Sequence, residues 1–221
     1  IANKKPIVAS NNTSELPLVY VDDLITSFIQ TLENTPPGVY WPEITPQYHA
    51  TFKELSSQIQ AFEDSRTNNV SESVGKGLTR ALYATYISYL PKERFVYDLT
   101  KHSDERGLFV EFLKTKNSGQ FAYFTAHPGV TRGGHYHHTK TEKFIVISGT
   151  ARFNFRNIDT NETYELISSE VKPQIIETAP GWTHEVTNIG EKQLVAMLWA
   201  SEIYDSNRPD TLACEVKYEK N

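Results

Sequence analysis

The pattern of apolar residues along the chain changes at Pro91, and this change constrains the fold more than any other feature of the sequence. Beyond it, short apolar or alternating runs follow one another, and turn residues separate them. Such runs are typical of an all-β sandwich or barrel. We therefore predict a barrel over residues 94–221, with strands in RFVYDLT, GLFVEFLK, GQFAYFTAH, KFIVISGTARFNF, TYELIS, PQIIETAP, HEVTNIG and QLVAMLWAS.

Residues 1–93 have the patterns of helices joined by polar loops. The stretch VDDLITSFIQTLEN places its apolar residues on one helical stripe, and Asp22 or Asp23 is the expected N-cap. Two more stretches, TFKELSSQIQAFEDS and KGLTRALYATYISYL, have helical spacing, and Pro91 ends the second. The prediction is thus an α+β chain with a mostly helical part over 1–93 and a barrel over 94–221.

Composition excludes several classes of partner. A net charge of −5 and a pI near 5.8 argue against nonspecific binding to nucleic acid or to an anionic membrane. The single cysteine, Cys214, excludes an internal disulfide framework and fits a reducing compartment. No apolar run has membrane-spanning length, and no signal segment opens the chain. We expect a cytoplasmic protein, and because the chain begins at Ile1 we expect it to be a fragment of a longer one.

Four residues have the spacing and chemistry of metal ligands. His135 and His137 are two apart in a predicted strand, so their side chains lie on the same face. Glu142 follows a short connection, and a second segment, APGWTHEVTNIG, supplies His184. Three imidazoles and one carboxylate suit Zn²⁺ or another divalent metal and leave a coordination position for solvent or substrate.

Glycines accompany this set, and we expect Gly133, Gly134 and Gly181 to let the backbone bend close to the site. An isolated histidine pair is more often part of a surface or a core, but the assembled set of four favours a metal. The other histidines lack this pattern: His138 points outward from the strand, His127 precedes a proline, and His49 and His102 have no partner motif.

The spacing of these residues resembles the two motifs of the cupin superfamily. Gly129, His135, His137, Glu142 and Gly149 fit the first motif throughout. The second fits in part, with Gly181, His184 and Asn188, although its proline is adjacent to the glycine and an upstream glycine is missing. The resemblance implies a jelly-roll barrel that holds a metal through the four ligands. It leaves the activity open, because cupins include dioxygenases, isomerases, storage proteins and regulators.

Two stretches resemble nucleotide-sugar 3,5-epimerases. SDERGLFVEFLK matches their Asp-x-Arg-Gly-x-Phe-x-Glu pattern, and RGGHY resembles their Arg-Gly-Leu-His-Tyr. The resemblance implies that Arg106, Glu111 and Arg132 bind substrate, since guanidinium groups suit diphosphate oxygens. It also implies that His135 removes a proton. An imidazole nitrogen bound to metal cannot accept a proton, so further candidates for proton transfer stay open, namely metal-bound water, Tyr123, His127 and Tyr136.

The helical part resembles a different family. LPLVYVDDLITSFIQTLEN is similar to a segment that opens a substrate-lobe helix in extended short-chain dehydrogenase/reductases. No Gly-rich dinucleotide fingerprint occurs in the sequence. Two Tyr-x-x-x-Lys matches, Tyr97/Lys101 and Tyr136/Lys140, lie in strand-like contexts, where four residues span about 13 Å. Reductase chemistry needs that pair on a helix, so we expect no nicotinamide cofactor site in this chain.

A reductase substrate lobe followed by an epimerase-like cupin resembles the bifunctional nucleotide-sugar enzymes of capsular polysaccharide synthesis. The resemblance implies that the cupin inverts C3 of a UDP-linked 4-keto-6-deoxy-N-acetylhexosamine. In the full-length enzyme, NADPH then reduces the C4 ketone to give UDP-N-acetyl-L-talosamine, towards UDP-N-acetyl-L-fucosamine. It further implies Zn²⁺ as the metal and a homodimer. Two alternatives stay open, a metal-dependent dioxygenase and a noncatalytic sugar-binding cupin.

Overall fold

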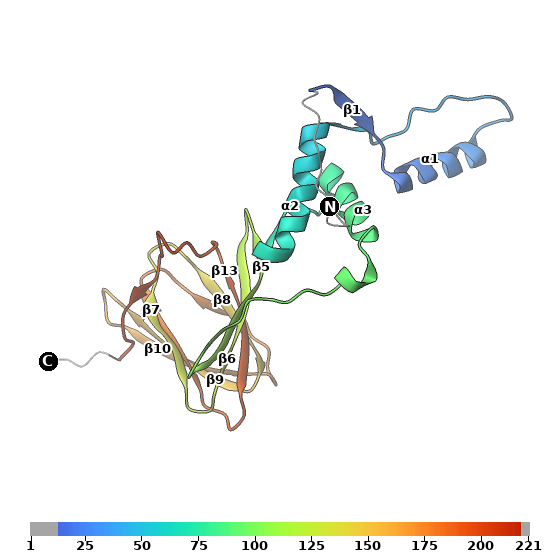
Figure 1. Cartoon of the computed structure of the whole chain (residues 1–221). Coiled ribbons are helices and arrows are strands. Elements are labelled where there is room, and N and C mark those ends of the chain that lie inside the picture. The colour runs from blue at the N-terminus through green and yellow to red at the C-terminus, as the bar shows by residue number, and fades with distance from the viewer. Residues whose placement is uncertain (1–12, 218–221) are drawn as a thin grey trace. The chain divides into compact units, whose positions relative to one another are not determined.

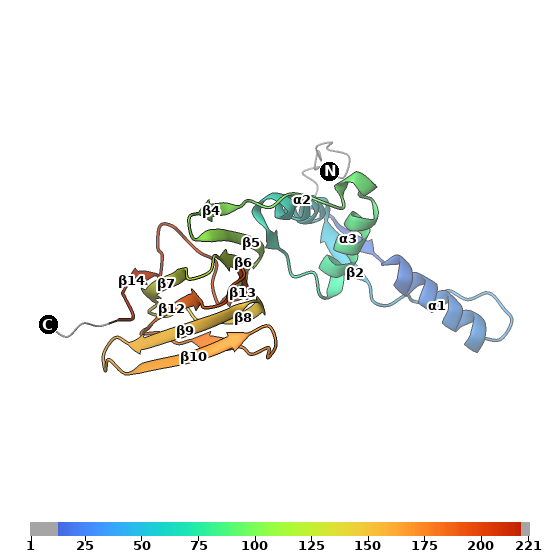
Figure 2. The same ribbon diagram turned by 90° about the horizontal axis from the view of Figure 1, so that it is seen from below.

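The computed structural model describes residues 13–217 of the chain. Contacts within the chain divide it into two units, Ile1–Tyr97 and Asp98–Asn221 (Figures 1 and 2). The predicted boundary, between residues 93 and 94, lies close to this division. Residues 1–12, which belong to the predicted helical part, lie outside the described residues. Among the described residues, no helix has both the length and the apolar character needed to cross a bilayer.

The first unit contains the three predicted helices. They are α1 (Val21–Asn34), α2 (Phe52–Asn68) and α3 (Gly77–Ser88). Strand β1 (Glu15–Leu18) pairs with β2 (Tyr48–Thr51), and the unit also holds β3 (Val70–Ser71) and the short 3₁₀ helix η1 (Lys92–Arg94). A small core of Phe62, Tyr86 and Leu90 packs α2 against α3.

The starts of α1 and α2 differ in how they are capped. Thr51 caps α2, because its hydroxyl accepts from the Glu54 backbone N–H while the Glu54 carboxylate accepts from the Thr51 backbone N–H. For α1 the predicted cap is wrong. The N-cap is Tyr20, and Asp22 and Asp23 lie inside the first turn, where their charges favour the positive end of the helix dipole without capping it.

The second unit is a two-sheet jelly roll, which confirms the predicted barrel. One sheet has the order β10-β9-β12-β7-β14, and the other has the order β11-β8-β13-β6-β5, with β4 paired to β5. The strands are β4 (His102–Asp104), β5 (Gly107–Thr115), β6 (Gly119–Ala126), β7 (Thr131–Tyr136), β8 (Glu142–Ser148), β9 (Thr150–Asn157), β10 (Thr163–Ser169), β11 (Ile176–Thr178), β12 (Trp182–Asn188), β13 (Leu194–Ala200) and β14 (Leu212–Ala213).

One predicted strand is absent. The run RFVYDLT includes the end of η1, and residues 95–100 form no strand. Its apolar side chains are exposed, with Phe95 at 68 % and Val96 at 77 %. An apolar run becomes a strand only where another strand pairs with it, and in the described structure this segment has no such partner.

The core of the jelly roll leaves space between the sheets. Along β13 the inward positions alternate large and small, because Leu194 and Leu198 alternate with Ala196 and Ala200. The facing strand β6 also places alanines inward, at positions 122 and 126. Leu198 and Ala200 of β13 line a cavity between the sheets, together with phenylalanines from the neighbouring strands.

Candidate metal centre

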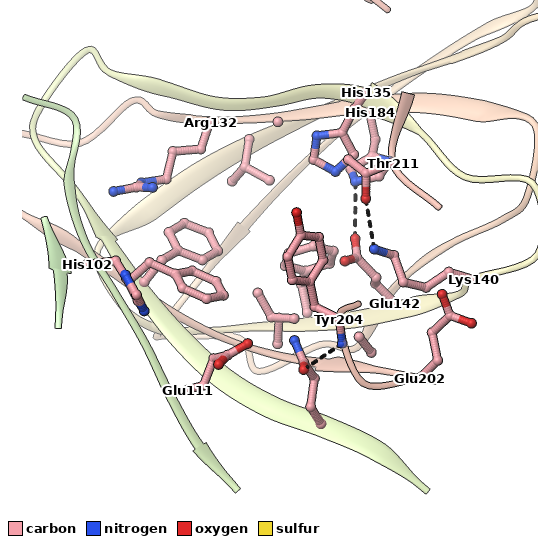
Figure 3. A pocket seen from close by; sticks show the side chains of 18 of the residues that line it. His102, Glu111, Arg132, His135, Lys140, Glu142, His184, Glu202, Tyr204 and Thr211 are labelled. Atoms are coloured by element: carbon pink, nitrogen blue, oxygen red, sulfur yellow. Dashed lines mark hydrogen bonds and ion pairs between the residues drawn. The ribbon is translucent and has the colours of Figure 1, made fainter. Parts of the chain in front are cut away.

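A cavity of about 610 Å³ lies between the two sheets of the jelly roll (Figure 3). Residues of β5, β6, β8 and β13 line it from one sheet, and residues of β7 and β12 line it from the other. This volume lies within the range of about 300–1,000 Å³ that small-molecule sites occupy. The lining includes phenylalanines, two arginines, and His135, Glu142 and His184 of the predicted metal site.

The structure brings together the four predicted ligands. His135 is the last residue but one of β7, His137 follows directly after that strand, Glu142 begins β8, and His184 lies on β12. One potential ligand atom from each residue lies within 4.8 Å of those of the other three. Three of the four side chains are almost fully buried, namely His137, Glu142 and His184.

Strand register explains how the chain joins residues that are distant in sequence. His184 on β12 pairs with His135 on β7, and their ring centroids lie 4.7 Å apart. The register shifts between His184 and Glu185, so the backbone of β12 presses against Gly133. Gly133 has φ +102°, and a Cβ there would lie 2.6 Å from the His184 carbonyl oxygen. Only glycine fits at this position, as the sequence predicts.

Hydrogen bonds fix which imidazole nitrogens face the centre. Nδ1 of His137 contacts the backbone carbonyl of Asp210, and Nδ1 of His184 lies 3.4 Å from the carbonyl of Trp182. A carbonyl oxygen only accepts, so each Nδ1 carries a proton, and in the neutral form of each ring the lone pair lies at Nε2. This arrangement is usual for histidines that bind metal through Nε2.

Both Nε2 atoms then face a carboxylate. Nε2 of His184 lies 3.2 Å from Oε2 of Glu142, and Nε2 of His137 lies 3.3 Å from the same oxygen. These three buried atoms have no hydrogen-bond partner in the described structure. Two ligands on a tetrahedral Zn²⁺, each about 2.0–2.2 Å from it, are separated by roughly 3.3–3.5 Å. The observed separations fit a shared cation.

The charges of the centre also favour a cation. Burial by itself raises the pKa of Glu142, but hydrogen bonding with His137 and His184 and electrostatic attraction to them outweigh burial and hold that pKa below its usual value. Glu142 is therefore a carboxylate. Burial, and then the neighbouring His184, lower the pKa of His135 to about 4, so this ring resists protonation. A divalent metal balances the carboxylate without protonating a buried imidazole.

The predicted substrate-binding residues also line the cavity. Arg106 donates to the Asp104 carboxylate through Nε at 3.0 Å and Nη2 at 2.5 Å, and this contact lowers the pKa of Asp104 to about 2. Arg132 donates from Nε to the Thr125 carbonyl, while its Nη2 is buried and has no hydrogen-bond partner among the described residues. Glu111 forms an ion pair with Lys114 at 2.7 Å.

Three of the four predicted proton-transfer residues lie elsewhere. His135 lines the cavity, and in the described structure Tyr123, His127 and Tyr136 do not. Tyr123 alternates along β6 with the cavity residues Gln120 and Phe124 and so lies on the other face of the sheet. Tyr136 lies on the opposite face of β7 from His135 and contacts His138, and His127 is exposed in the loop after β6.

The structure adds residues to the cavity that sequence patterns did not single out. Lys140 and Thr211 line it together, and Asp210 supports its rim from the C-terminal segment. His102, which has no partner motif in the sequence, also lines the cavity. Contacts between distant segments bring Asp210 and Thr211 there, so a local motif carries no signal for them, whereas Lys140 lies between the ligands His137 and Glu142 in the sequence.

Comparisons with known proteins agree with this architecture. The sequence signature of the polysaccharide biosynthesis C-terminal domain matches residues 102–212. A Pseudomonas aeruginosa protein named UDP-2-acetamido-2,6-beta-L-arabino-hexul-4-ose reductase is 52% identical over 211 residues, which are 96% of this chain and 57% of that protein. The Bacillus subtilis spore coat polysaccharide biosynthesis protein SpsL is 26% identical over 125 residues, 52% of this chain and 83% of its own length.

Solved structures are similar over almost the whole chain. CapF from Staphylococcus aureus superposes with a TM-score of 0.89 and 35% identity, over 97% of this chain and 58% of CapF. CapF with the inhibitor 3-isopropenyl-tropolone superposes with a TM-score of 0.91 and 35% identity, over 97% of this chain and 62% of that protein. The chain thus spans about three fifths of the length of these relatives. It is a CapF-like protein and belongs to the polysaccharide biosynthesis C-terminal domain family.

Proposed function

We propose that the jelly roll is a metal-dependent isomerase that inverts a carbon next to a ketone in a UDP-linked sugar. The observation that carries this proposal is the approach of Glu142 Oε2 to the Nε2 atoms of His137 and His184, at 3.3 and 3.2 Å, with all three atoms buried. These electron-rich atoms need a cation, and they lie beside a cavity of about 610 Å³.

The relatives support the class of substrate. The P. aeruginosa relative is named as a reductase of a UDP-linked 2-acetamido sugar with a ketone at C4. We transfer this substrate class to the present chain as a proposal, since the chain spans 57% of that relative. The reacting carbon is then C3 of a UDP-4-keto-6-deoxy-N-acetylhexosamine, because C3 lies next to the C4 ketone.

The chemistry depends on stabilising negative charge. When the C3 proton leaves, the electrons of the C–H bond form a C3–C4 double bond, and the carbonyl electron pair moves to the C4 oxygen. Return of a proton to the opposite face of C3 reverses both shifts and inverts the centre. A divalent metal held by His135, His137, Glu142 and His184 supplies Lewis-acid stabilisation of that oxygen. Zn²⁺ is the metal that best suits this donor set.

The chain's own residues bind and orient the sugar. Arg132 presents a buried Nη2 without a hydrogen-bond partner in the described structure, which suits an oxygen of the diphosphate. Arg106 lies in the same cavity, with Asp104 holding its guanidinium in place. Proton transfer requires a group that faces the cavity. Of the four residues proposed from sequence, His135 meets this condition, and it can accept a proton only at a nitrogen that does not bind metal.

The complete enzyme adds a second reaction in this proposal. Residues 1–93 form part of the substrate lobe of a short-chain reductase, whose nucleotide-binding half lies outside this chain. The apolar stripe of α1 is exposed here, with Phe28 at 53 % and Leu32 at 83 %, and the missing half would cover it. NADPH bound to that half reduces the C4 ketone to give UDP-N-acetyl-L-talosamine, for capsular polysaccharide, and the enzyme acts as a homodimer in the cytoplasm.

The decisive test measures isotope exchange at C3. The Zn²⁺-loaded chain, and the full-length enzyme beside it, are incubated with the UDP-4-keto sugar in D₂O and followed by NMR. We expect deuterium to enter C3 in both. His137→Ala should abolish exchange, whereas His138→Ala, which changes an exposed neighbour, should retain it. Absence of exchange in both metal-loaded proteins overturns the isomerase, and consumption of oxygen instead would identify a dioxygenase.

An inhibitor of a similar protein provides a second test of the same site. CapF has been solved with a tropolone inhibitor. A tropolone anion carries its charge on two adjacent oxygens of one ring, and such a pair suits a divalent metal with open coordination positions. We propose that tropolone binds this chain at the cluster of His135, His137, Glu142 and His184.

A further inference from the structure

Lys140 is a buried cation that the metal cluster does not explain. Its side chain is 7 % exposed, and it lines the same cavity as His135, Glu142 and His184. Its Nζ donates to Oγ1 of Thr211 at 2.9 Å (Figure 3). Within residues 13–217 no carboxylate forms an ion pair with this ammonium. Burying an unpaired charge is costly unless a partner arrives from outside the chain.

The surroundings hold Lys140 in one place. Its backbone N–H donates to Oδ2 of Asp210 at 2.8 Å, which anchors the residue at the rim of the cavity. Thr211, next to Asp210, holds the other end of the side chain. An ammonium has three N–H donors, and Thr211 occupies one of them. The others remain available to an oxygen in the cavity, and they are already oriented before a ligand enters.

We propose that Lys140 is a catalytic residue that donates a hydrogen bond to the substrate oxygen on which negative charge develops. This inference rests on the proposed isomerase function and adds a second cation to its site. The Lys140 ammonium would share the charge on the C4 oxygen with the metal that the four ligands would hold. Lys140 forms no bond to carbon. A preorganised donor of this kind acts most strongly in a site that excludes water.

A structural role makes a different prediction. If Lys140 only ties the β7–β8 connection to the C-terminal segment through Thr211, a neutral donor of similar length serves equally well. Lys140→Gln is that variant, since its amide can still donate to the Thr211 hydroxyl. Lys140→Met removes both the donor and the charge. Lys143→Met is the matched control, because Lys143 is an exposed lysine on β8 whose ammonium pairs with Glu177 outside the cavity.

The experiment compares these variants as Zn²⁺-loaded full chains. Readouts are deuterium exchange at C3, tropolone affinity by calorimetry, bound zinc and the melting temperature. We expect both Lys140 variants to lose about 100-fold in kcat for exchange, as for loss of an oxyanion donor, while KM changes by less than about threefold. Tropolone affinity should fall about tenfold, since its anion places an oxygen at the same point. Bound zinc should stay equal to wild type, and Lys143→Met should match wild type throughout.

Opposite outcomes overturn the proposal. If Lys140→Gln exchanges deuterium and binds tropolone as wild type does, the charge has no role. If both variants lose zinc or fail to fold, Lys140 is a structural anchor. If wild type itself shows no exchange, the isomerase proposal fails, and the tropolone titration still decides whether Lys140 contacts an anionic oxygen beside the metal.

Discussion

Asp210 supports His137 although the two residues lie 73 positions apart in the chain. Its backbone carbonyl accepts from Nδ1 of His137, and its carboxylate accepts from the backbone N–H groups of His138, Thr139 and Lys140 at 2.7, 2.8 and 2.8 Å. One residue of the C-terminal segment thus fixes both the tautomer of a metal ligand and the course of the chain after it.

This relationship predicts that Asp210→Ala weakens the metal site without touching a ligand. The substitution retains the backbone carbonyl at position 210, but loss of the carboxylate removes the three hydrogen bonds that hold this carbonyl against the His137 imidazole. Zinc affinity should fall about 10- to 100-fold, as is usual when a group that orients a ligand is lost. Competition with a chelating dye measures it. Asp205→Ala is the control, because Asp205 accepts from Asn207 in a local turn and should leave affinity unchanged.

Removal of the metal should destabilise the jelly roll. Metal that binds the folded state at 100 times its Kd stabilises it by about 2.7 kcal/mol. Treatment with a chelator should therefore lower the melting temperature, and added Zn²⁺ should restore it. Glu142→Gln, which removes the carboxylate ligand, should melt at the same temperature with and without chelator. An equal response of both proteins to the chelator would place the metal elsewhere.

Gly133→Ala should be one of the most damaging small substitutions in the barrel. The new Cβ would lie 2.6 Å from the His184 carbonyl oxygen, at a backbone φ of +102°. We expect a loss of more than about 1–3 kcal/mol in the free energy of unfolding, since the clash adds to backbone strain. Urea denaturation measures it. Gly190→Ala is the matched control, because its nearest contact is an ordinary 3.5 Å, and it should change stability by less than about 0.5 kcal/mol.

Glu170 should make the free energy of unfolding depend on pH in the acidic range. Hydrogen bonds from Lys192 and from the Gly149 backbone N–H lower the pKa of Glu170 to about 2, against 4.5 as the ordinary value. The unfolded state therefore binds this proton first, and the contribution of Glu170 is present above pH 4.5 and lost as pH falls towards 2. In chelator, the difference in urea midpoint between wild type and Glu170→Gln should shrink between pH 6 and pH 2. A constant difference contradicts the prediction.

Arg132 should contribute to nucleotide affinity. Its buried Nη2 lacks a hydrogen-bond partner in the described structure, and a charge-assisted hydrogen bond to a phosphate contributes about 1.5–3 kcal/mol. Arg132→Gln should therefore weaken UDP binding by roughly 10- to 100-fold and leave the weak binding of uridine unchanged. Calorimetry with the two ligands separates the effects. Arg152→Gln on β9, outside the cavity, should bind UDP as wild type does.

Local patterns in the sequence predicted most of the barrel and the convergence of its four candidate ligands. Period-two alternation indicated the strands, and His135 and His137 share a face because a strand turns its side chains by half a turn per residue. The glycine at position 133 was also predictable, since a chain that bends beside a cluster needs a residue without Cβ. The strands, the shared face and the glycine depend on near neighbours in the chain, which a sequence pattern records, whereas the approach of His184 was predicted from the resemblance to the two cupin motifs.

Tertiary structure alone decided the rest. The run RFVYDLT has the composition of a strand but forms none, because in the described structure no other strand pairs with it. Tyr123 and Tyr136 are close in sequence to the metal ligands but face away from the cavity. Asp210 has no motif, and it contacts His137 and Lys140 because the C-terminal segment returns beside β7 through β14. Contacts between segments some seventy residues apart depend on the path of the whole chain, so no local pattern reports them.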